Sequence, residues 1–192
     1  MSSRKTFSVG HSNHSWETFS RLLDLAGVDT VIDIRSNPRS RYHHFNQREL
    51  KARLEHIGLP YVYLGDQLGG QIEGSYQDAA QSSTFQEGLD QVCAIALRCR
   101  PALLCAEHEP LACHRFLLVS RALAKTGMEV AHILRDGSIE SQQQTEQRLL
   151  RLTRIDSEDF LSTAEERLAA ASINKNNASP VRGGRNDNLY LR

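Results

Sequence analysis

The chain has 192 residues, of which 40% are hydrophobic and 24% are charged, a composition typical of a soluble protein with one hydrophobic core. Its 23 basic and 23 acidic residues balance, so no overall charge draws it to nucleic acid or to an anionic membrane. No apolar stretch approaches the roughly 20 residues of a membrane-spanning helix, and the N-terminus has no apolar signal region. We therefore expect a cytoplasmic protein with no membrane partner.

Strand-like and helix-like segments alternate along most of the chain. Five short apolar runs are predicted strands, at residues 6–10, 30–34, 61–64, 102–105 and 129–134. Between them lie four predicted helices, at residues 15–27, 46–56, 84–98 and 111–125, and a glycine-rich loop at residues 65–75. Strands that alternate with helices are typical of a layered α/β/α fold with a mostly parallel sheet, and we expect this fold class.

Polar side chains mark where three of these helices should begin. Ser15 is a predicted N-cap, because its hydroxyl can accept a hydrogen bond from a free backbone N–H. Asn46 with Glu49, and Thr84 with Glu87, have the spacing of a capping box. These positions give the expected start of each helix.

The sequence changes character after Asp136 and Gly137. We expect residues 1–137 to form the α/β domain, with residues 129–134 as its last strand. Residues 138–172 have an amphipathic helical pattern and are predicted to form a helical extension packed on that domain. Residues 173–192 contain few core-forming side chains and are predicted to be a flexible tail.

Polar residues follow four of the predicted strands at their carboxyl ends. Ligands bind beyond these ends in an open parallel sheet, so we expect the four loops to line one cleft. Arginine binds phosphate and carboxylate in a bidentate fork, and basic side chains outnumber acidic ones in these loops. We therefore predict a small anionic substrate. The predicted anion-binding residues are Ser12, Asn13, Arg35, Arg39, Arg41 and Arg115.

The segment CAEHEPLACHR, residues 105–115, carries most of the candidate catalytic groups. A thiol near a helix N-terminus or a positive charge has a lowered pKa, and its thiolate is a nucleophile. Cys105 follows a predicted strand and Cys113 lies in the first turn of a predicted helix, so either is a candidate nucleophile. The candidates for proton transfer are His11, Glu107 and His114. These groups predict a thiol-dependent enzyme of undetermined reaction class that needs no cofactor.

Two alternatives stay open. The first is a metal-dependent enzyme. Cys105, Cys113 and His114 are soft and borderline donors that could hold a divalent metal such as zinc or iron, and Glu107, His108 or His11 could complete the ligand set, although the paired spacing of a structural zinc site is absent. The arginine-rich loop at residues 35–41 could instead make the protein a non-catalytic nucleotide- or nucleic-acid-binding module. Nucleic acid is the less favoured partner, because few aromatic residues accompany the arginines. The sequence predicts no oligomeric state.

Three short motifs follow one another along the chain. They are GHS at residues 10–12, VIDIRSNPRSR at residues 31–41 and CAEHEPLACHR at residues 105–115. In this order they resemble the GHS/T, V-D-[IV]-R-x-x-P-x-S-R and C-x-E-x-x-P-x-x-C-H-R elements of the DUF488 family of uncharacterised bacterial and archaeal proteins. The resemblance extends over residues 6–136, and it implies no established activity.

Two sequence features also resemble a second, more distant group of domains. The stretch TVIDIRS has a strand-Asp-x-Arg pattern, and Cys105 ends a strand that is followed by a helix, Gly127 and another strand. This order is similar to that of rhodanese-like domains and implies a rhodanese-like fold. By this resemblance, Cys105 matches the cysteine that forms a persulfide or attacks phosphate. The segment from Cys105 to Arg115 is longer than the corresponding loop and carries a second cysteine.

Overall fold

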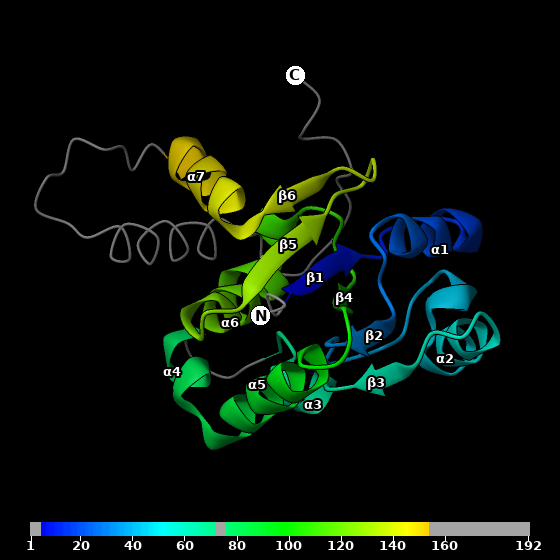
Figure 1. The fold of residues 1–192 in the computed structure, drawn as a ribbon, viewed down its shortest axis with the longest axis horizontal. Helices are drawn as coiled ribbons and strands as arrows, with labels where there is room; N and C mark the ends of the chain where they lie inside the picture. Colours follow the sequence, from blue (N-terminus) through cyan, green and yellow to red (C-terminus); the bar gives the residue numbers. More distant parts are fainter. Residues whose placement is uncertain (1–4, 72–75, 154–192) are drawn as a thin grey trace, which may run out of the picture. The chain divides into compact units, whose positions relative to one another are not determined.

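The sheet of this protein has six strands. The computed structural model describes residues 5–71 and 76–153. Residues 1–146 form one unit, and the remainder belongs to a second unit, of which residues 147–153 are described. The strands are β1 (Lys5–Gly10), β2 (Thr30–Asp33), β3 (Tyr61–Tyr63), β4 (Pro101–Cys105), β5 (Glu129–Ile133) and β6 (Ile139–Ser141). They are arranged in the order β3-β2-β4-β1-β5-β6 (Figure 1).

Strand β4 lies at the centre of the sheet, between β2 and β1. It is parallel to both, and Leu104 stands opposite Asp33 on one side and Val9 on the other. All five residues of β4 are buried, which is typical of a parallel strand covered on both faces. Only β6, which pairs with β5, runs antiparallel to its neighbour in the described sheet. The expected α/β fold with a mostly parallel sheet is confirmed.

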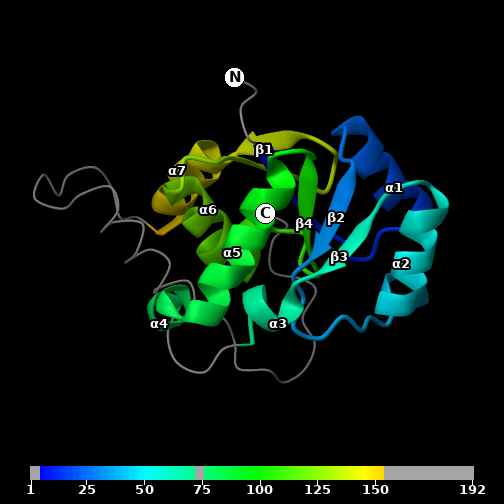
Figure 2. The same cartoon turned by 60° about the horizontal axis from the view of Figure 1, so that its bottom comes forward.

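Helices cover both faces of the sheet. The described α-helices are α1 (Trp16–Leu25), α2 (Gln47–His56), α3 (Gly65–Leu68), α4 (Tyr76–Gln81), α5 (Ser83–Ala96), α6 (Arg121–Lys125) and α7 (Gln142–Thr153). Figure 2 shows α1 and α2 on one face, and α3, α5 and α6 on the other. Successive strand residues point to opposite faces, so Leu104 packs in the core with Phe19 of α1, while Leu103 packs with Leu89 of α5. Among the described residues, no helix has the length and apolar character needed to cross a bilayer.

The helix starts agree only in part with the predicted caps. Ser15 caps α1 as expected, through its side-chain oxygen. Asn46 occupies the N-cap position of α2, but its side chain accepts a hydrogen bond from the backbone N–H of Ser40 instead. The predicted cap at Thr84 is wrong, because α5 starts earlier and Ser82 caps it.

The predicted helix at residues 111–125 is broken in the structure. A short 3-10 helix, Pro110–Ala112, ends at Cys113, whose backbone is extended with φ −132° and ψ 139°. A π-helix, Arg115–Ser120, then leads into α6. The prediction that Cys113 lies in the first turn of a helix is therefore wrong. Single π-helical turns are frequent at functional sites.

Two further predictions of secondary structure are wrong. The first residues of the predicted glycine-rich loop form the helix α3. Residues 139–141, expected to be helical, form β6, because Gly137 with φ +88° turns the chain back along β5. The predicted last strand is thus followed by one more, and the helix begins at Gln142. Most of the predicted helical extension, and all of the predicted tail, lie outside the described residues, so the domain boundaries stay predictions.

Candidate functional site

The carboxyl ends of β1, β2 and β4 are joined side by side at one edge of the sheet. The backbone N–H of His11, just after β1, donates to the carbonyl of Cys105 at 2.9 Å. On the other side of β4, the N–H of Ile34 donates to the carbonyl of Leu104 at 3.1 Å. The loops that follow the three strands therefore start from fixed, adjacent positions.

Four side-chain atoms meet directly after β4. The sulfur atoms of Cys105 and Cys113 are 2.9 Å apart. Glu107 Oε2 lies 3.0 Å from the first sulfur and 3.2 Å from the second, and His114 Nδ1 lies 3.6 Å and 3.9 Å from them. Each cysteine is only 2% exposed, whereas Glu107 is exposed. We refer to these four residues as the thiol cluster; Glu107 lies on its solvent side.

The ring of His114 is held in one orientation. Its Nε2 lies 3.2 Å from the carbonyl oxygen of Ile34, and because a carbonyl can only accept, Nε2 carries the hydrogen and donates. Nδ1 therefore faces the two sulfur atoms. Gly70 lies against the ring so closely that a Cβ there would overlap His114. No local pattern distinguishes this glycine from the neighbouring glycines, so it is not among the predicted site residues.

The protonation states within the thiol cluster are interdependent. Burial acts to raise the pKa of the Cys105 thiol, but the hydrogen bond from Cys113 and the charge of His114 outweigh it and lower this pKa well below its usual value. Burial, together with Cys105, raises the pKa of Cys113. Burial acts to lower the pKa of His114, yet the negative charge of Cys105 raises it. Although Glu107 is exposed as a residue, desolvation of its carboxyl group beside the sulfur atoms, together with Cys105, raises its pKa. The arrangement thus favours a Cys105 thiolate beside a His114 imidazolium, with the remaining thiol proton on Cys113.

Arg115 holds the backbone beside this cluster. Its side chain is fully buried, and its guanidinium donates through Nη1 to the carbonyl of Glu107 and through Nη2 to that of His108, the latter at 2.8 Å. A Cβ at Gly10 would overlap both the Glu107 carbonyl and the Arg115 guanidinium. In this structure Arg115 therefore supports the loop after β4. Its predicted anion-binding role stays a prediction.

Arg35 is likewise engaged inside the protein. Its Nε and Nη2 donate to the two carboxylate oxygens of Asp33, at 2.8 Å and 2.5 Å. Its Nη1 donates to the carbonyl of Phe45 at 2.8 Å, and Tyr61 donates to Asp33 at 2.7 Å. Burial acts to lower the pKa of Arg35, but Asp33 raises it. The guanidinium thus stays charged, in an ion pair with Asp33 at the end of β2 and in a hydrogen bond to Phe45 in the short 3-10 turn before α2.

His11 lies buried between these groups. Its Nδ1 donates to the carbonyl of Ser12 at 2.9 Å, its ring stacks on Phe45 at 4.4 Å between centroids, and its Nε2 has no hydrogen-bond partner among the described residues. Burial, and secondarily the charge of Arg35, lowers the pKa of His11 to about 4. The imidazole is therefore neutral at pH 7, and the free Nε2 is an acceptor.

Ser12 and Asn13 contact a residue that the sequence reasoning missed. Arg135, which follows β5, donates to Ser12 Oγ at 3.3 Å and to Asn13 Oδ1 at 2.8 Å. Ser12 has a φ of +46°, a left-handed conformation that is uncommon for serine. Applying the rule for strand ends to the fifth predicted strand, as well as to the first four, would have selected Arg135.

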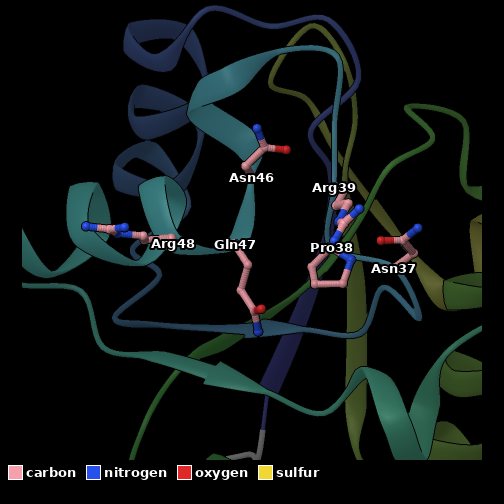
Figure 3. A pocket seen from close by; sticks show the side chains of 6 residues that line it. All are labelled: Asn37, Pro38, Arg39, Asn46, Gln47 and Arg48. Carbon is pink, nitrogen blue, oxygen red and sulfur yellow. The ribbon is translucent and has the colours of Figure 1, made fainter.

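Arg39 and Arg41 are both exposed on the loop after β2. Arg39 borders a pocket of about 530 Å³ between this loop and the start of α2. Figure 3 shows the side chains around it, with Arg39 next to Pro38 and with Gln47 extending from the first turn of α2. The lining residues are Asn37, Pro38, Arg39, Asn46, Gln47 and Arg48.

Comparison with known proteins identifies the family. A family model described as "Domain of unknown function DUF488" matches residues 15–122, more than half of the chain and including the second and third motifs. No curated protein and no solved structure matches the chain. The resemblance to rhodanese-like domains stays a prediction. The match and the motifs together establish that the chain belongs to the DUF488 family.

Proposed function

We propose that this protein is a thiol-dependent enzyme that acts on a small substrate carrying an anionic group. The observation that carries the proposal is the placement of two thiols 2.9 Å apart, with the Nδ1 of His114 at 3.6 Å from Cys105. A cysteine beside a histidine is the arrangement of an activated nucleophile. The depressed pKa of Cys105 agrees with this geometry.

The two cysteines have different roles in this proposal. The Cys105 thiolate attacks an electrophilic centre of the substrate and expels a leaving group, to which Glu107 or His114 gives a proton. With a disulfide substrate, the product is a mixed disulfide on Cys105 and one released thiol. Cys113, after losing its proton to Glu107, then attacks the Cys105 sulfur and releases the second thiol. The dithiol is oxidised to a disulfide, and the substrate disulfide is reduced by the same two electrons.

The anion-binding part of the proposal depends on the exposed arginines. Because the guanidinium groups of Arg35 and Arg115 donate to Asp33 and to backbone carbonyls, we assign contact with the anion to Arg39 and Arg41. Both belong to the loop that directly follows β2, and Arg39 borders a pocket. The nucleotide- or nucleic-acid-binding alternative also uses this loop, and it stays a prediction.

The nucleophile is tested by alkylating the protein with iodoacetamide from about pH 5 to about pH 9, after treatment with a chelator, and assigning each thiol by peptide mass spectrometry. For each thiol, the midpoint of the plot of alkylation rate against pH is compared and not the rate itself, because burial slows the access of the reagent to the thiol at every pH. We expect a lower midpoint for Cys105 than for Cys93. His114→Gln should raise the Cys105 midpoint, whereas the control His108→Gln should leave it unchanged. Equal midpoints for Cys105 and Cys93 in the wild type would overturn the proposal.

The anionic specificity is tested with two reagents of similar size. Iodoacetate is negatively charged and iodoacetamide is neutral. An anion-binding site near Cys105 therefore raises the ratio of the alkylation rate with iodoacetate to the alkylation rate with iodoacetamide. We expect this ratio to be higher at Cys105 than at Cys93, and to fall in the double variant Arg39→Gln/Arg41→Gln. Arg98→Gln, at an exposed position just after α5, is the control. An unchanged ratio in the double variant would remove the anion-binding role and leave the nucleophile in place.

A further inference from the structure

The thiol cluster has the donor atoms of a metal site. Zn²⁺ binds sulfur at about 2.3 Å and nitrogen or oxygen at about 2.0–2.2 Å, so the ligand atoms of a tetrahedral site lie about 3.4–3.8 Å from one another. The sulfur–nitrogen distances in the cluster, 3.6 Å and 3.9 Å, are already close to this range. The sulfur–sulfur and sulfur–oxygen distances, 2.9–3.2 Å, are shorter. The donor atoms of Cys105, Cys113 and His114 all lie within 4.8 Å of one another. Glu107 contacts both sulfur atoms, and its carboxylate would have to turn toward His114 Nδ1 to complete four-coordinate geometry.

The cluster contains three acidic groups and one base, His114, so a cation can balance the negative charge that a single imidazolium leaves uncompensated. Two thiols and one carboxyl group, each of which becomes negative on losing its proton, lie within 3.2 Å of one another. A nucleophilic thiolate gains nothing from a carboxylate in contact with its sulfur, because like charges repel. Within the described part of the chain, the guanidinium of Arg115 donates to the backbone carbonyls of Glu107 and His108 and not to the Glu107 carboxylate. The Glu107 carboxylate is thus directed at the sulfur atoms, which a divalent cation between them would stabilise.

The surroundings orient the ligands as metal sites require. Metal-binding histidines usually donate their second ring N–H to a carbonyl or carboxylate, which fixes the tautomer. His114 does so through Nε2 to Ile34, so Nδ1 faces the sulfur atoms and, once it has lost its proton, directs its lone pair at them. The backbone N–H of Arg115 approaches the sulfur of Cys113 at 3.5 Å. Cys105 and Cys113 are buried, His114 is half-buried, and Glu107 is the exposed ligand.

We propose that Cys105, Cys113, His114 and Glu107 bind one Zn²⁺ ion, with Glu107 as the fourth and exchangeable ligand. Two sulfurs, one imidazole nitrogen and one oxygen form a set suited to zinc. The inference rests on the proposed function, because it concerns the same two thiols. Thiolates that hold the ion are unavailable as nucleophiles, so zinc occupancy switches the thiol chemistry off, and removal of the ion restores it.

The test is a titration of chelator-treated protein with Co²⁺, which reports sulfur ligands by thiolate-to-cobalt charge-transfer absorption. We expect one equivalent to bind, and Zn²⁺ to displace it. Cys113→Ser should clearly reduce the charge-transfer absorption, because one of the two thiolate ligands is lost. Glu107→Gln should retain that absorption, since both thiolates remain, but should weaken binding by more than about tenfold. The matched controls Cys93→Ser and His108→Gln should bind Co²⁺ like the wild type. Circular dichroism of each metal-free variant verifies that it is folded.

The outcomes separate this inference from the proposed function. Absence of charge-transfer absorption in the wild type, or full retention of it in Cys113→Ser, would overturn the zinc site. If the Cys105 midpoint is low in metal-free protein and no Co²⁺ binds, the zinc site fails and the thiol chemistry stands. If Co²⁺ binds through both thiols but the metal-free Cys105 has the midpoint of Cys93, the site stands as a metal centre and the thiol enzyme fails.

Discussion

The buried imidazole of His11 makes the stability of the protein sensitive to acid. Its pKa is about 4 in the folded protein, against about 6.5 for an unperturbed histidine. Between these values the unfolded chain binds a proton that the folded protein does not, so the free energy of unfolding falls as the pH falls. The contribution of neutral His11 to the free energy of unfolding is fully present above about pH 6.5 and is lost by about pH 4. It amounts to about 3 kcal/mol.

We therefore expect His11→Asn to reduce the loss of stability on acidification. The asparagine amide can still donate to the carbonyl of Ser12, which Nδ1 does in the wild type, but it does not titrate. Urea unfolding at about pH 7 and at about pH 4.5 gives the difference for each variant. His56→Asn, at an exposed position, is the control and should retain the wild-type difference. An NMR titration of the His11 ring that gave a pKa near 6.5 would contradict the argument.

The sequence predicted which kinds of residue form the site better than it predicted what each residue does there. The motif around Cys105 and Cys113 places thiols, an acid and a histidine within eleven residues, and in the structure they do converge. The arginines were harder to interpret. Exposed Arg39 and buried Arg35 belong to the same short stretch of sequence, and only the three-dimensional position of Asp33 and the Phe45 carbonyl distinguishes them. Long-range partners of this kind leave no local signal.

At the level of elements, the helix after β4 shows why boundaries were missed. Helical spacing continues from Leu111 into α6, so the periodicity predicts one helix. The Glu109 side chain instead accepts from the N–H of Leu111 and starts a 3-10 turn at Pro110. The extended backbone of Cys113 then separates this turn from the π-helix. The interruption directs the Cys113 sulfur back toward Cys105, and a continuous helix would not be expected to do this.

The close approach of β1 to the loop after β4 depends on Gly10. A Cβ at this position would overlap the Glu107 carbonyl and the Arg115 guanidinium. We expect Gly10→Ala to lower the free energy of unfolding by about 3 kcal/mol and to change the alkylation rate of Cys105, because the loop that carries Glu107 must move. Chemical denaturation and the iodoacetamide assay measure the two effects.

Gly58→Ala is the matched control for this substitution. Gly58 has a φ of +77° and no atom within 4 Å of the added Cβ, so alanine there costs only conformational strain, about 1 kcal/mol. It should leave Cys105 alkylation unchanged. Equal destabilisation by the two substitutions would show that the loop after β4 tolerates a side chain at Gly10.

For the whole molecule, the alternation of strands and helices was sufficient to predict the layered fold. The alternation did not predict the order of the strands in the sheet. β4 lies between β2 and β1, although both of these strands come earlier in the sequence. Insertion of this kind follows from packing on both faces of the sheet. It has a consequence for function: the segment after β4 lies between the loops after β1 and β2, where their side chains can contact the thiol cluster.

The same arrangement predicts how stability is distributed over the sheet. β4 is buried and paired on both sides, with β1 and β2 as its neighbours. β6 is an edge strand whose three residues are exposed or half-buried, including Ile139 at 48% exposure. We expect the amides of β4, β1 and β2 to exchange with deuterium only through global unfolding, and those of β6 to exchange through smaller openings. Hydrogen exchange followed by mass spectrometry at increasing urea concentration distinguishes the two. If β6 exchanged as slowly as β4, then the antiparallel edge would unfold together with the parallel centre, and the hairpin at Gly137 would belong to the same cooperative unit as the site.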